Sequence, residues 1–311
     1  MDGTARIDAR VDTDTDVLIA TPGRRGPAAA LELLKPITWF APMWAFMCGA
    51  VSTGSSAQVG WWSVGLGIVL AGPMVCGTSQ AVNDWFDRHV DAINEPGRPI
   101  PSGRLPGRTG LYIAVAWTAA SLAVAAVLGR LVFDAAMIGL AIAWAYSAPP
   151  LRLKENGWIG NLACGACYEG LPWFTGAALM SGGWPSWHVM AAVTLYSLGA
   201  HGIMTLNDFK SIEGDRQMGI NSLPVLLGAE RAARLACLVM GVPQAVMALL
   251  LLQWGRPWFA AGVVVLLAVQ AGLMVRFLRE PRRLAPWYNG TGTLGFVLGM
   301  LLVAFALRGG A

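Results

Sequence analysis

Nine apolar stretches, each long enough to cross a lipid bilayer, dominate the sequence. They cover approximately residues 37–53, 61–83, 109–128, 132–148, 160–180, 188–207, 231–252, 257–275 and 288–307. A helix needs roughly 17–25 mostly apolar residues to cross about 30 Å of hydrocarbon. Because lipid offers no hydrogen-bond partners, the backbone has to satisfy itself within a helix or a closed barrel. We therefore expect an all-α membrane protein with nine transmembrane helices.

The composition agrees with burial in lipid. Of the 311 residues, 55% are hydrophobic and 13% are charged, whereas a soluble domain carries roughly 25% charged residues. The 38 glycines and 14 tryptophans fit a helical bundle, where small residues allow close helix packing and Trp lies at the interfaces. A net charge of +4 suggests nucleic-acid binding only in a soluble protein. We expect a lipid bilayer and no nucleic acid as partner.

The distribution of basic residues predicts the orientation. With a cytoplasmic N-terminus, nine spans place 19 of the 22 Lys and Arg residues on the cytoplasmic side, and only Arg130, Arg256 and Arg308 on the other. Cytoplasmic loops of membrane proteins carry this excess of Lys and Arg. We therefore expect the N-terminus in the cytoplasm and the C-terminus outside.

The N-terminal segment precedes the first apolar stretch. Residues 1–26 are rich in Asp and fit neither a signal peptide nor a transit peptide, so we expect a disordered cytoplasmic tail. Residues 27–36 are expected to form a short interfacial helix. Residues 27–311 as a whole are expected to form a single polytopic domain.

Two similar acidic clusters follow the second and sixth stretches. They occupy residues 83–91 and 207–215, which indicates two pseudo-repeat halves with one cluster in each. Asp84, Asp87 and Asp91 stand at i, i+3 and i+7, so on a helix they share one face. We expect helical spacing in the second cluster as well.

These clusters predict a metal-dependent site. Crowded carboxylates repel one another and are costly beside hydrocarbon, and a hard divalent cation removes both penalties. Mg²⁺ is usually bound through one or two carboxylates together with substrate phosphates. The alternative, solvated acids that set the orientation, is weaker because Asp and Glu contribute little to it. The expected ligands are Asn83 and the carboxylates that we also predict to be catalytic: Asp84, Asp87, Asp91, Asp208 and Asp215.

Basic and polar side chains complete the expected diphosphate site. Arg pairs with phosphate oxygens through two parallel hydrogen bonds, and Lys acts as a point charge. For any one of these bases, a role in setting the membrane topology explains its position as well as diphosphate binding does. Besides Asn83, the residues expected to bind the diphosphate and its metal are Arg98, Tyr146, Arg152, Lys154, Asn207, Lys210 and Glu213.

Other polar residues lie inside or beside the predicted spans. An ionisable group within a span is a candidate for function. Glu169 suits an acceptor pocket or a bond to a neighbouring helix, and His201 suits the same pocket or a buried core position. Cys164 and Cys167 form a single C-x-x-C without a second pair, so we expect buried thiols rather than a metal site. His89 is expected at the surface.

The motifs resemble those of the UbiA-type intramembrane prenyltransferase superfamily. The pattern is N-D-x-x-D-x-x-x-D at 83–91, R-P-x-P-S-G at 98–103, and a second acidic motif followed by G-x-x-S-L-P at 219–224. The stretches NDWFDRHVDAINEPGRPIPSGR and LNDFKSIEGDRQMGINSLPV resemble its bacteriochlorophyll and chlorophyll synthase branch. Many members of the superfamily carry an Asp four residues before the last Asp of the second motif, where this chain has Ser211. That branch also departs there, which leaves open which acids contact the second metal.

The resemblance implies an enzyme that esterifies the 17-propionate of bacteriochlorophyllide a with geranylgeranyl or phytyl diphosphate and releases diphosphate. It also implies Mg²⁺ as cofactor, with Mn²⁺ able to replace it, and a bacterial inner membrane with the site at the cytoplasmic face. Contact with other pigment-biosynthesis or photosystem-assembly proteins is a further implication. A prenyltransferase of the same fold acting on haem or a quinone precursor stays open. An ion-coupled transporter also shows internal repeats, but its acids are expected near the bilayer midplane.

Overall fold

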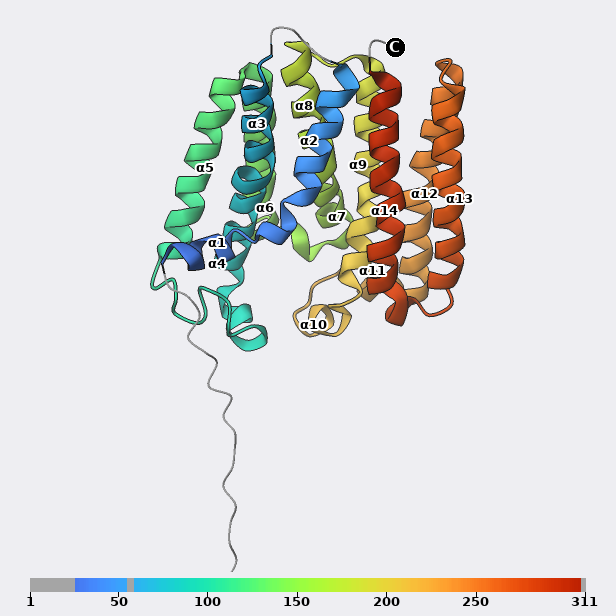
Figure 1. Cartoon of the computed structure of the whole chain (residues 1–311). Helices are drawn as coiled ribbons and strands as arrows, with labels where there is room; N and C mark the ends of the chain where they lie inside the picture. The colour runs from blue at the N-terminus through green and yellow to red at the C-terminus, as the bar shows by residue number, and fades with distance from the viewer. Residues whose placement is uncertain (1–25, 55–58, 309–311) are drawn as a thin grey trace, which may run out of the picture.

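The computed structural model describes residues 26–54 and 59–308, and these ranges are helical (Figure 1). Within them there is no strand, only an isolated bridge between Asn156 and Asn221. The expected tail at residues 1–26 lies almost wholly outside the described residues. The all-α fold predicted from the apolar stretches is confirmed.

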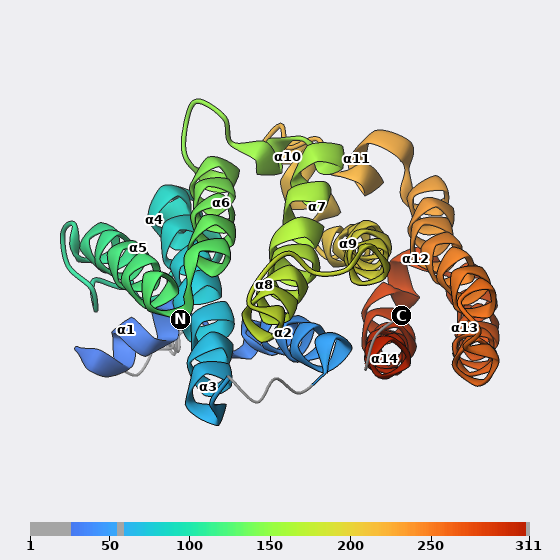
Figure 2. The same ribbon diagram turned by 90° about the horizontal axis from the view of Figure 1, so that it is seen from above.

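Long helices stand side by side as rods of one bundle (Figures 1 and 2). Seven of them are long and apolar enough to cross a membrane. One is continuous through α3 (Trp61–Val69), the π-helix η2 (Leu70–Cys76) and α4 (Gly77–Asn94). The others are α5 (Thr109–Leu128), α6 (Arg130–Ser147), α9 (Trp187–Asp208), α12 (Ala229–Gln253), α13 (Pro257–Phe277) and α14 (Pro281–Leu307).

Two further rods complete the bundle among the described residues. One is α2 (Phe40–Thr53), and the other runs through α7 (Gly157–Gly165), the π-helix η4 (Ala166–Gly170) and α8 (Leu171–Ser181). Each of the nine predicted stretches falls on one rod. The protein is therefore an integral multi-pass membrane protein. The exact number of spans and the orientation stay predictions, because seven helices meet the length and hydropathy needed.

Local sequence explains several helix starts. The side chain of Asn156 accepts hydrogen bonds from the backbone N–H groups of Trp158 and Ile159, which caps α7. Pro257 and Pro281 open α13 and α14, where a missing N–H costs nothing. These ends place the connecting loops at the two faces of the bundle.

Glycines bring two rods into backbone contact. A Cβ atom at Gly49 of α2 would lie 2.0 Å from the carbonyl oxygen of Trp173, and one at Gly176 of α8 would lie 2.1 Å from that of Phe46. Only glycine fits such an approach, which is how membrane helices pack without a hydrophobic driving force between them. The contact fixes α2 against α8 at the centre of the molecule.

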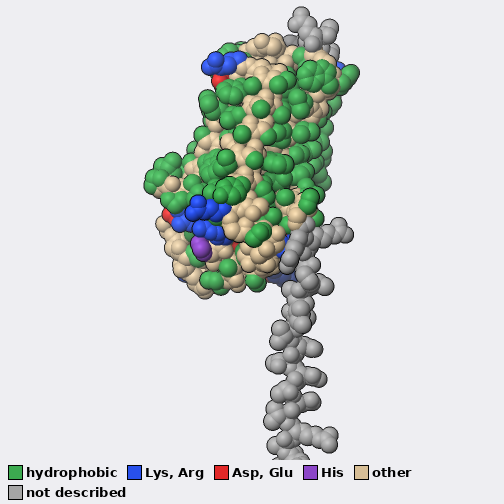
Figure 3. Space-filling view, turned by 90° about the vertical axis from the view of Figure 1, so that its left-hand side faces the viewer, with side chains coloured by type: hydrophobic (Ala, Val, Ile, Leu, Met, Phe, Trp, Pro, Cys, Tyr) green, Lys and Arg blue, Asp and Glu red, His purple; other side chains and the backbone are tan. Residues whose placement is uncertain are grey.

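Short elements gather at the end of the bundle opposite the C-terminus (Figure 1). The helix predicted over residues 27–36 is present as α1 (Pro27–Leu33), which ends before Lys35, and the separate 3-10 turn η1 (Pro36–Thr38) follows. The interfacial position of α1 stays a prediction. On the face in Figure 3, hydrophobic side chains cover the middle of the molecule, and Lys and Arg gather toward its ends. The short elements are α1 (Pro27–Leu33), η1 (Pro36–Thr38), η3 (Leu153–Glu155), α10 (Ile212–Gln217) and α11 (Leu223–Leu227).

Candidate active site

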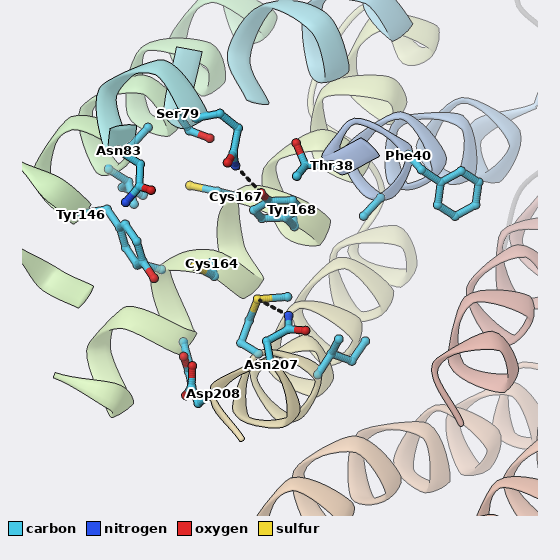
Figure 4. Close-up of a pocket in the computed structure, with 18 of the residues that line it drawn as sticks. Thr38, Phe40, Ser79, Asn83, Tyr146, Cys164, Cys167, Tyr168, Asn207 and Asp208 are labelled. Carbon is cyan, nitrogen blue, oxygen red and sulfur yellow. Dashed lines mark hydrogen bonds between the residues drawn. The ribbon is translucent and has the colours of Figure 1, made fainter. Parts of the chain in front are cut away.

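A cavity of about 490 Å³ lies between α2, α4, α6, α7, α9 and α14. Four of the predicted site residues line it: Asn83, Tyr146, Asn207 and Asp208 (Figure 4). Asn83 comes from the first acidic motif, and Asn207 and Asp208 come from the second. The fold therefore brings residues of both acidic motifs to a common space.

The first motif lies on α4, with its carboxylates held by bases. The guanidinium Nη1 of Arg98 lies 3.2 Å from Oδ1 of Asp84 and 2.8 Å from Oδ2 of Asp91. One side chain thus bridges positions i and i+7, which confirms that these two acids share a helix face. Asp84 is only 2% exposed and also accepts a hydrogen bond from Nζ of Lys35 at 2.7 Å.

Asp87 occupies the edge of the same face, next to the cavity. It is paired with the ammonium group of Lys154. Asn83 donates from Nδ2 to Oδ2 of Asp87 at 2.9 Å and to Oγ of Ser147 at 3.2 Å. With its nitrogen engaged twice, Asn83 offers its carbonyl oxygen as an acceptor or metal ligand.

Two of the basic residues have strained backbones. Lys35 and Arg152 have φ angles of 47° and 36°, and they are the non-glycine residues with positive φ within the described ranges. Such conformations cost about 1–3 kcal/mol and are found where surrounding structure enforces them. Lys35 directly precedes η1, and Arg152 directly precedes η3. The surrounding structure therefore holds the backbone in place at the start of both segments.

The second motif is not one continuous helix, so the expected helical spacing is wrong there. Helix α9 ends at Asp208, and α10 begins at Ile212 after a turn. Asp208 lines the cavity and accepts a hydrogen bond from Nδ2 of Asn161 at 3.1 Å. Asp215 is 7% exposed and accepts from Oγ of Ser211 at 2.9 Å, away from the cavity wall.

Several predicted residues lie outside the cavity lining. Arg152 and Glu213 pair with exposed neighbours, Glu155 and Arg216, each at 3.1 Å. Lys210, Glu169 and His201 are also absent from the wall, as are Asp215 and the ion-paired residues around the first motif, namely Asp84, Asp87, Asp91, Arg98 and Lys154.

The two intramembrane candidates for an acceptor pocket are buried within the bundle. Glu169 is 5% exposed within η4, and His201 packs against Trp158 with ring centroids 5.9 Å apart. Neither lines the cavity. Their roles in an acceptor pocket stay predictions. The exposed position expected for His89 is confirmed.

Sequence reasoning missed residues that the fold brings to the site from other segments. Lys35 is one of the 19 bases that the sequence predicts on the cytoplasmic side, and the structure brings it into contact with Asp84. Asn161 binds Asp208, and Asn289 of α14 donates from Nδ2 to Oδ1 of Asn207 at 2.7 Å. Their common signal was weak: a single polar residue in or beside an otherwise apolar stretch.

Arg98 and Arg104 tie down the loop that follows α4. Nε of Arg98 lies 2.5 Å from Oε2 of Glu95, and this hydrogen bond lowers the pKa of Glu95. Nη2 of Arg104 lies 2.7 Å from Oε1 of Glu32 in α1, and this hydrogen bond lowers the pKa of Glu32. The loop is therefore linked to α1 by an ion pair whose acid stays charged at neutral pH.

The donor set fits a hard divalent cation shared with a substrate. Across residues 26–54 and 59–308, no group of three or more His, Cys, Asp or Glu side chains is arranged to hold a metal ion without help. The oxygens of Asn83, Asp84, Asp87, Asp91 and Asp208 are nevertheless the ligands that Mg²⁺ prefers. Because Mg²⁺ usually takes its other ligands from water and substrate phosphates, this set suits a cation that arrives with a diphosphate.

The sequence matches the UbiA prenyltransferase family over residues 39–291. Over 283 residues it is 57% identical to "Bacteriochlorophyll synthase 33 kDa chain" from Cereibacter sphaeroides, covering 91% of this chain and 94% of that protein. It is 38% identical over 290 residues to "Chlorophyll synthase, chloroplastic" from Oryza sativa, covering 89% of this chain and 76% of that protein.

A solved structure shares the fold. It is a UbiA homolog from Archaeoglobus fulgidus bound to DMAPP and Mg²⁺, and it superposes with a TM-score of 0.65 at 20% sequence identity. The match covers 86% of this chain and 99% of that one. At this identity the likeness establishes the arrangement of helices.

Proposed function

The chain belongs to the UbiA prenyltransferase family, and from that premise we propose that it esterifies the 17-propionate of bacteriochlorophyllide a with geranylgeranyl or phytyl diphosphate. The observation that carries the transfer chemistry is the meeting of Asn83 and Asp208, one from each acidic motif, on the wall of one cavity. The acceptor follows from the 57% identity to a bacteriochlorophyll synthase chain over nearly the full length of both proteins.

Charge around the first motif suits a leaving diphosphate. In the reaction the bond between the allylic carbon and the diphosphate oxygen breaks, the electron pair leaves with diphosphate, and a carboxylate oxygen of the acceptor bonds to that carbon. Lys35, Arg98 and Lys154 already surround the acids of α4. Fixed positive groups aimed at developing negative charge stabilise it without reorganisation.

A divalent cation would add to this charge. Mg²⁺, or Mn²⁺ in its place, would be held by Asn83 and Asp208 with Asp84, Asp87 and Asp91, and would supply Lewis acidity to the leaving group. Asp215 lies next to this set rather than on the cavity wall, and we place it in support of Asp208 through the turn at Ser211.

The acceptor carboxylate needs positioning rather than deprotonation. A propionate is ionised near neutral pH, because its pKa is close to that of Glu, about 4.3. The cavity reaches Ile37 and Phe40, which are 91% and 59% exposed on the outside of the bundle. We place the entry of the apolar chlorin at these residues, from the bilayer.

The prenyl tail requires more room than the main cavity. A volume of about 490 Å³ is that of a pocket for one drug-sized ligand, so tail and tetrapyrrole do not share it. Cys167 of the cavity wall also lines a narrow space of about 30 Å³ with Val75, Gly139 and Leu171. We call these four residues the neck.

The neck leads on to a larger apolar space. Leu171 and Ala135 line both the narrow space and a groove of about 490 Å³ between α6, α8 and α9. Exposed apolar residues on this outer groove include Ile138 and Leu198. From Tyr146 to Asp134 this route follows α6 for about 18 Å at 1.5 Å per residue. We place the distal isoprene units along it.

Location and partners follow from the same reading. We place the chain in the bacterial inner membrane with the site at the cytoplasmic face, on the distribution of its basic residues. Residues 27–311 act as one domain in this proposal. Other pigment-biosynthesis or photosystem-assembly proteins are candidate neighbours.

The test is an assay in membranes that contain the protein. Bacteriochlorophyllide a, geranylgeranyl diphosphate and Mg²⁺ should yield the esterified pigment, separated by chromatography. The 17-propionate methyl ester should give no product, because its carboxylate is blocked. Prenylation of the methyl ester, or faster turnover of haem or a quinone precursor, would contradict the acceptor and leave only the family.

A further inference from the structure

The asparagines that open the two acidic motifs are held differently. Asn83 donates to Asp87, four residues further along α4. The residue four positions after Asn207 is Ser211, and its hydroxyl donates to the carbonyl oxygen of Asp208 at 3.1 Å and to Oδ2 of Asp215 at 2.9 Å. The second motif therefore lacks the acidic partner that orients the first asparagine.

A residue from another helix holds Asn207 instead. Asn289 of α14 donates from Nδ2 to Oδ1 of Asn207 at 2.7 Å, and it accepts at Oδ1 from Oγ1 of Thr293 at 3.3 Å. Thr293 thus donates to Asn289, and Asn289 in turn donates to Asn207. Asn207 consequently accepts with its oxygen and turns its Nδ2 toward Met204, 3.8 Å from the sulfur, on the cavity wall (Figure 4).

The helix that carries Asn289 is anchored at this level. The preceding residue, Tyr288, is fully buried and stacks on Phe277 with ring centroids 4.9 Å apart. Its hydroxyl also accepts a hydrogen bond from Gln270 at 3.3 Å. Because α14 is fixed beside Asn289, the amide of Asn289 is a firm support for Asn207.

We propose that Asn289 is a positioning residue of the diphosphate site, which holds Asn207 so that its amide N–H donates to an oxygen of the bound diphosphate. The inference rests on the proposed function and adds a residue outside both motifs. The two asparagines then differ in chemistry: Asn83 offers an oxygen, which suits a cation, and Asn207 offers a donor, which suits a phosphate oxygen.

The experiment is a double-mutant cycle on the purified full-length protein. Binding of geranylgeranyl thiolodiphosphate, an unreactive analogue, is measured by calorimetry with Mg²⁺ and without acceptor. Asn289→Ala should weaken binding about tenfold, the scale of one hydrogen bond to a charged group. In the Asn207→Ala background the same change should have no further effect, because coupled residues are not additive. The KM for the acceptor should stay unchanged.

A matched control lies two residues away on the same helix. Thr291 is exposed and donates to the carbonyl oxygen of Trp287 in its own helix. Thr291→Ala removes a side-chain hydrogen bond from α14 without touching Asn207, so analogue binding should stay at the wild-type value. If Asn289→Ala does not fold, Asn289→Ser, too short to reach Asn207, replaces it with the same expected result.

Three results would overturn the proposal, and the third would overturn the proposed function with it. If the losses of analogue-binding free energy in the two single variants add up in the double variant, Asn289 does not act through Asn207. A raised acceptor KM with unchanged analogue binding would place Asn289 in the acceptor pocket. A wild-type protein that fails to bind the analogue would refute the proposed function as well, so the two failures are distinguishable.

Discussion

The ammonium group of Lys35 lies 2.7 Å from the carboxylate of Asp84, although the two residues are 49 positions apart in the chain. Lys35 reaches it from a strained left-handed backbone position between α1 and η1. Asp84 is 2% exposed, and a carboxylate buried to this extent needs partners that offset its lost hydration. The first acidic motif is thus completed by the segment that precedes the first long helix.

Removing Lys35 should weaken substrate binding more than it weakens the fold. We expect Lys35→Met to raise the KM for the prenyl diphosphate about tenfold, since one charge-assisted contact is lost while Arg98 still neutralises Asp84. Steady-state kinetics on membranes measure this. Arg279→Met, which removes an exposed base from the loop between α13 and α14, is the control and should leave KM unchanged. If KM rises equally in both variants, Lys35 contributes only through the overall charge of the protein.

Asp87 is the carboxylate of α4 most directly joined to the cavity wall, through Asn83. Asp87→Asn keeps the shape but removes a negative charge, and we expect turnover to fall about 10²–10³-fold. A chelator should silence the wild-type protein, and added Mg²⁺ should restore it. Size-exclusion elution in detergent verifies that the variant is folded. Wild-type turnover in Asp87→Asn would remove this residue from the metal site.

The fold was largely predictable because lipid leaves few choices. Each apolar stretch had to become a helix, and helices α5 and α13 begin where the pattern places them. The face shared by Asp84 and Asp91 followed from helical periodicity alone. What periodicity does not contain is which helices become neighbours, so the contacts of Lys35 and Asn289 were not foreseen.

The second acidic motif shows a different limit. Nothing between Asp208 and Ile212 is a helix breaker such as Pro or Gly, yet α9 ends there. The turn is stabilised by Ser211, whose hydroxyl bonds to the carbonyl oxygen of Asp208 and to Asp215. A Ser side chain competes with the helix for backbone partners in this way, but only the folded structure reveals when it wins.

Reporter fusions test the orientation. The short elements and both acidic motifs lie at one end of the bundle, and the C-terminus lies at the other (Figure 1). A reporter active only in the cytoplasm should give signal when fused after Met218 and none when fused at the C-terminus. Expression of both fusions is verified by immunoblot. The opposite pattern would invert the topology. Signal from both fusions would require an even number of spans between Met218 and the C-terminus.

The neck should discriminate between tails of different length. A Cβ atom at Gly139 would lie 3.4 Å from Cδ1 of Leu171 and 3.9 Å from Cγ1 of Val75, so a larger side chain fills the passage. We expect Gly139→Leu to lower kcat/KM for geranylgeranyl diphosphate at least tenfold, the scale of one methylene group in a tight pocket. With the ten-carbon geranyl diphosphate, kcat/KM should change less than threefold.

A glycine on another helix supplies the control for the neck. A Cβ atom at Gly272 of α13 would meet no neighbouring atom within 4 Å, so Gly272→Leu adds the same bulk without narrowing a passage. Both substrates should react with this variant as they do with the wild type. If Gly139→Leu lowers kcat/KM equally for the ten-carbon and twenty-carbon substrates, the tail does not lie in the neck.

Turnover should change little with pH in the neutral range, because the proposed nucleophile is already a carboxylate. A propionate with a pKa near 4.3 is ionised throughout about pH 6.5–8, so no base has to act in that window. The shifted acids outside the spans, Glu32 and Glu95, have lowered pKa values because of their hydrogen bonds from Arg104 and Arg98. A group with a lowered pKa in the fold stabilises it above its unfolded pKa and loses this effect only as the pH falls through the folded value.

Neither the nucleophile nor these ion pairs therefore titrates between about pH 6.5 and 8. We expect kcat/KM for bacteriochlorophyllide a to vary less than threefold across this window, measured at saturating Mg²⁺ so that metal occupancy stays constant. Prenylation of an aromatic ring, in contrast, has to remove a ring proton, and a base that titrates near neutrality would impose a slope. A tenfold rise of kcat/KM from pH 6.5 to 8 would show that a titrating group limits the reaction with bacteriochlorophyllide a. That result would contradict a mechanism in which the acceptor carboxylate needs positioning alone.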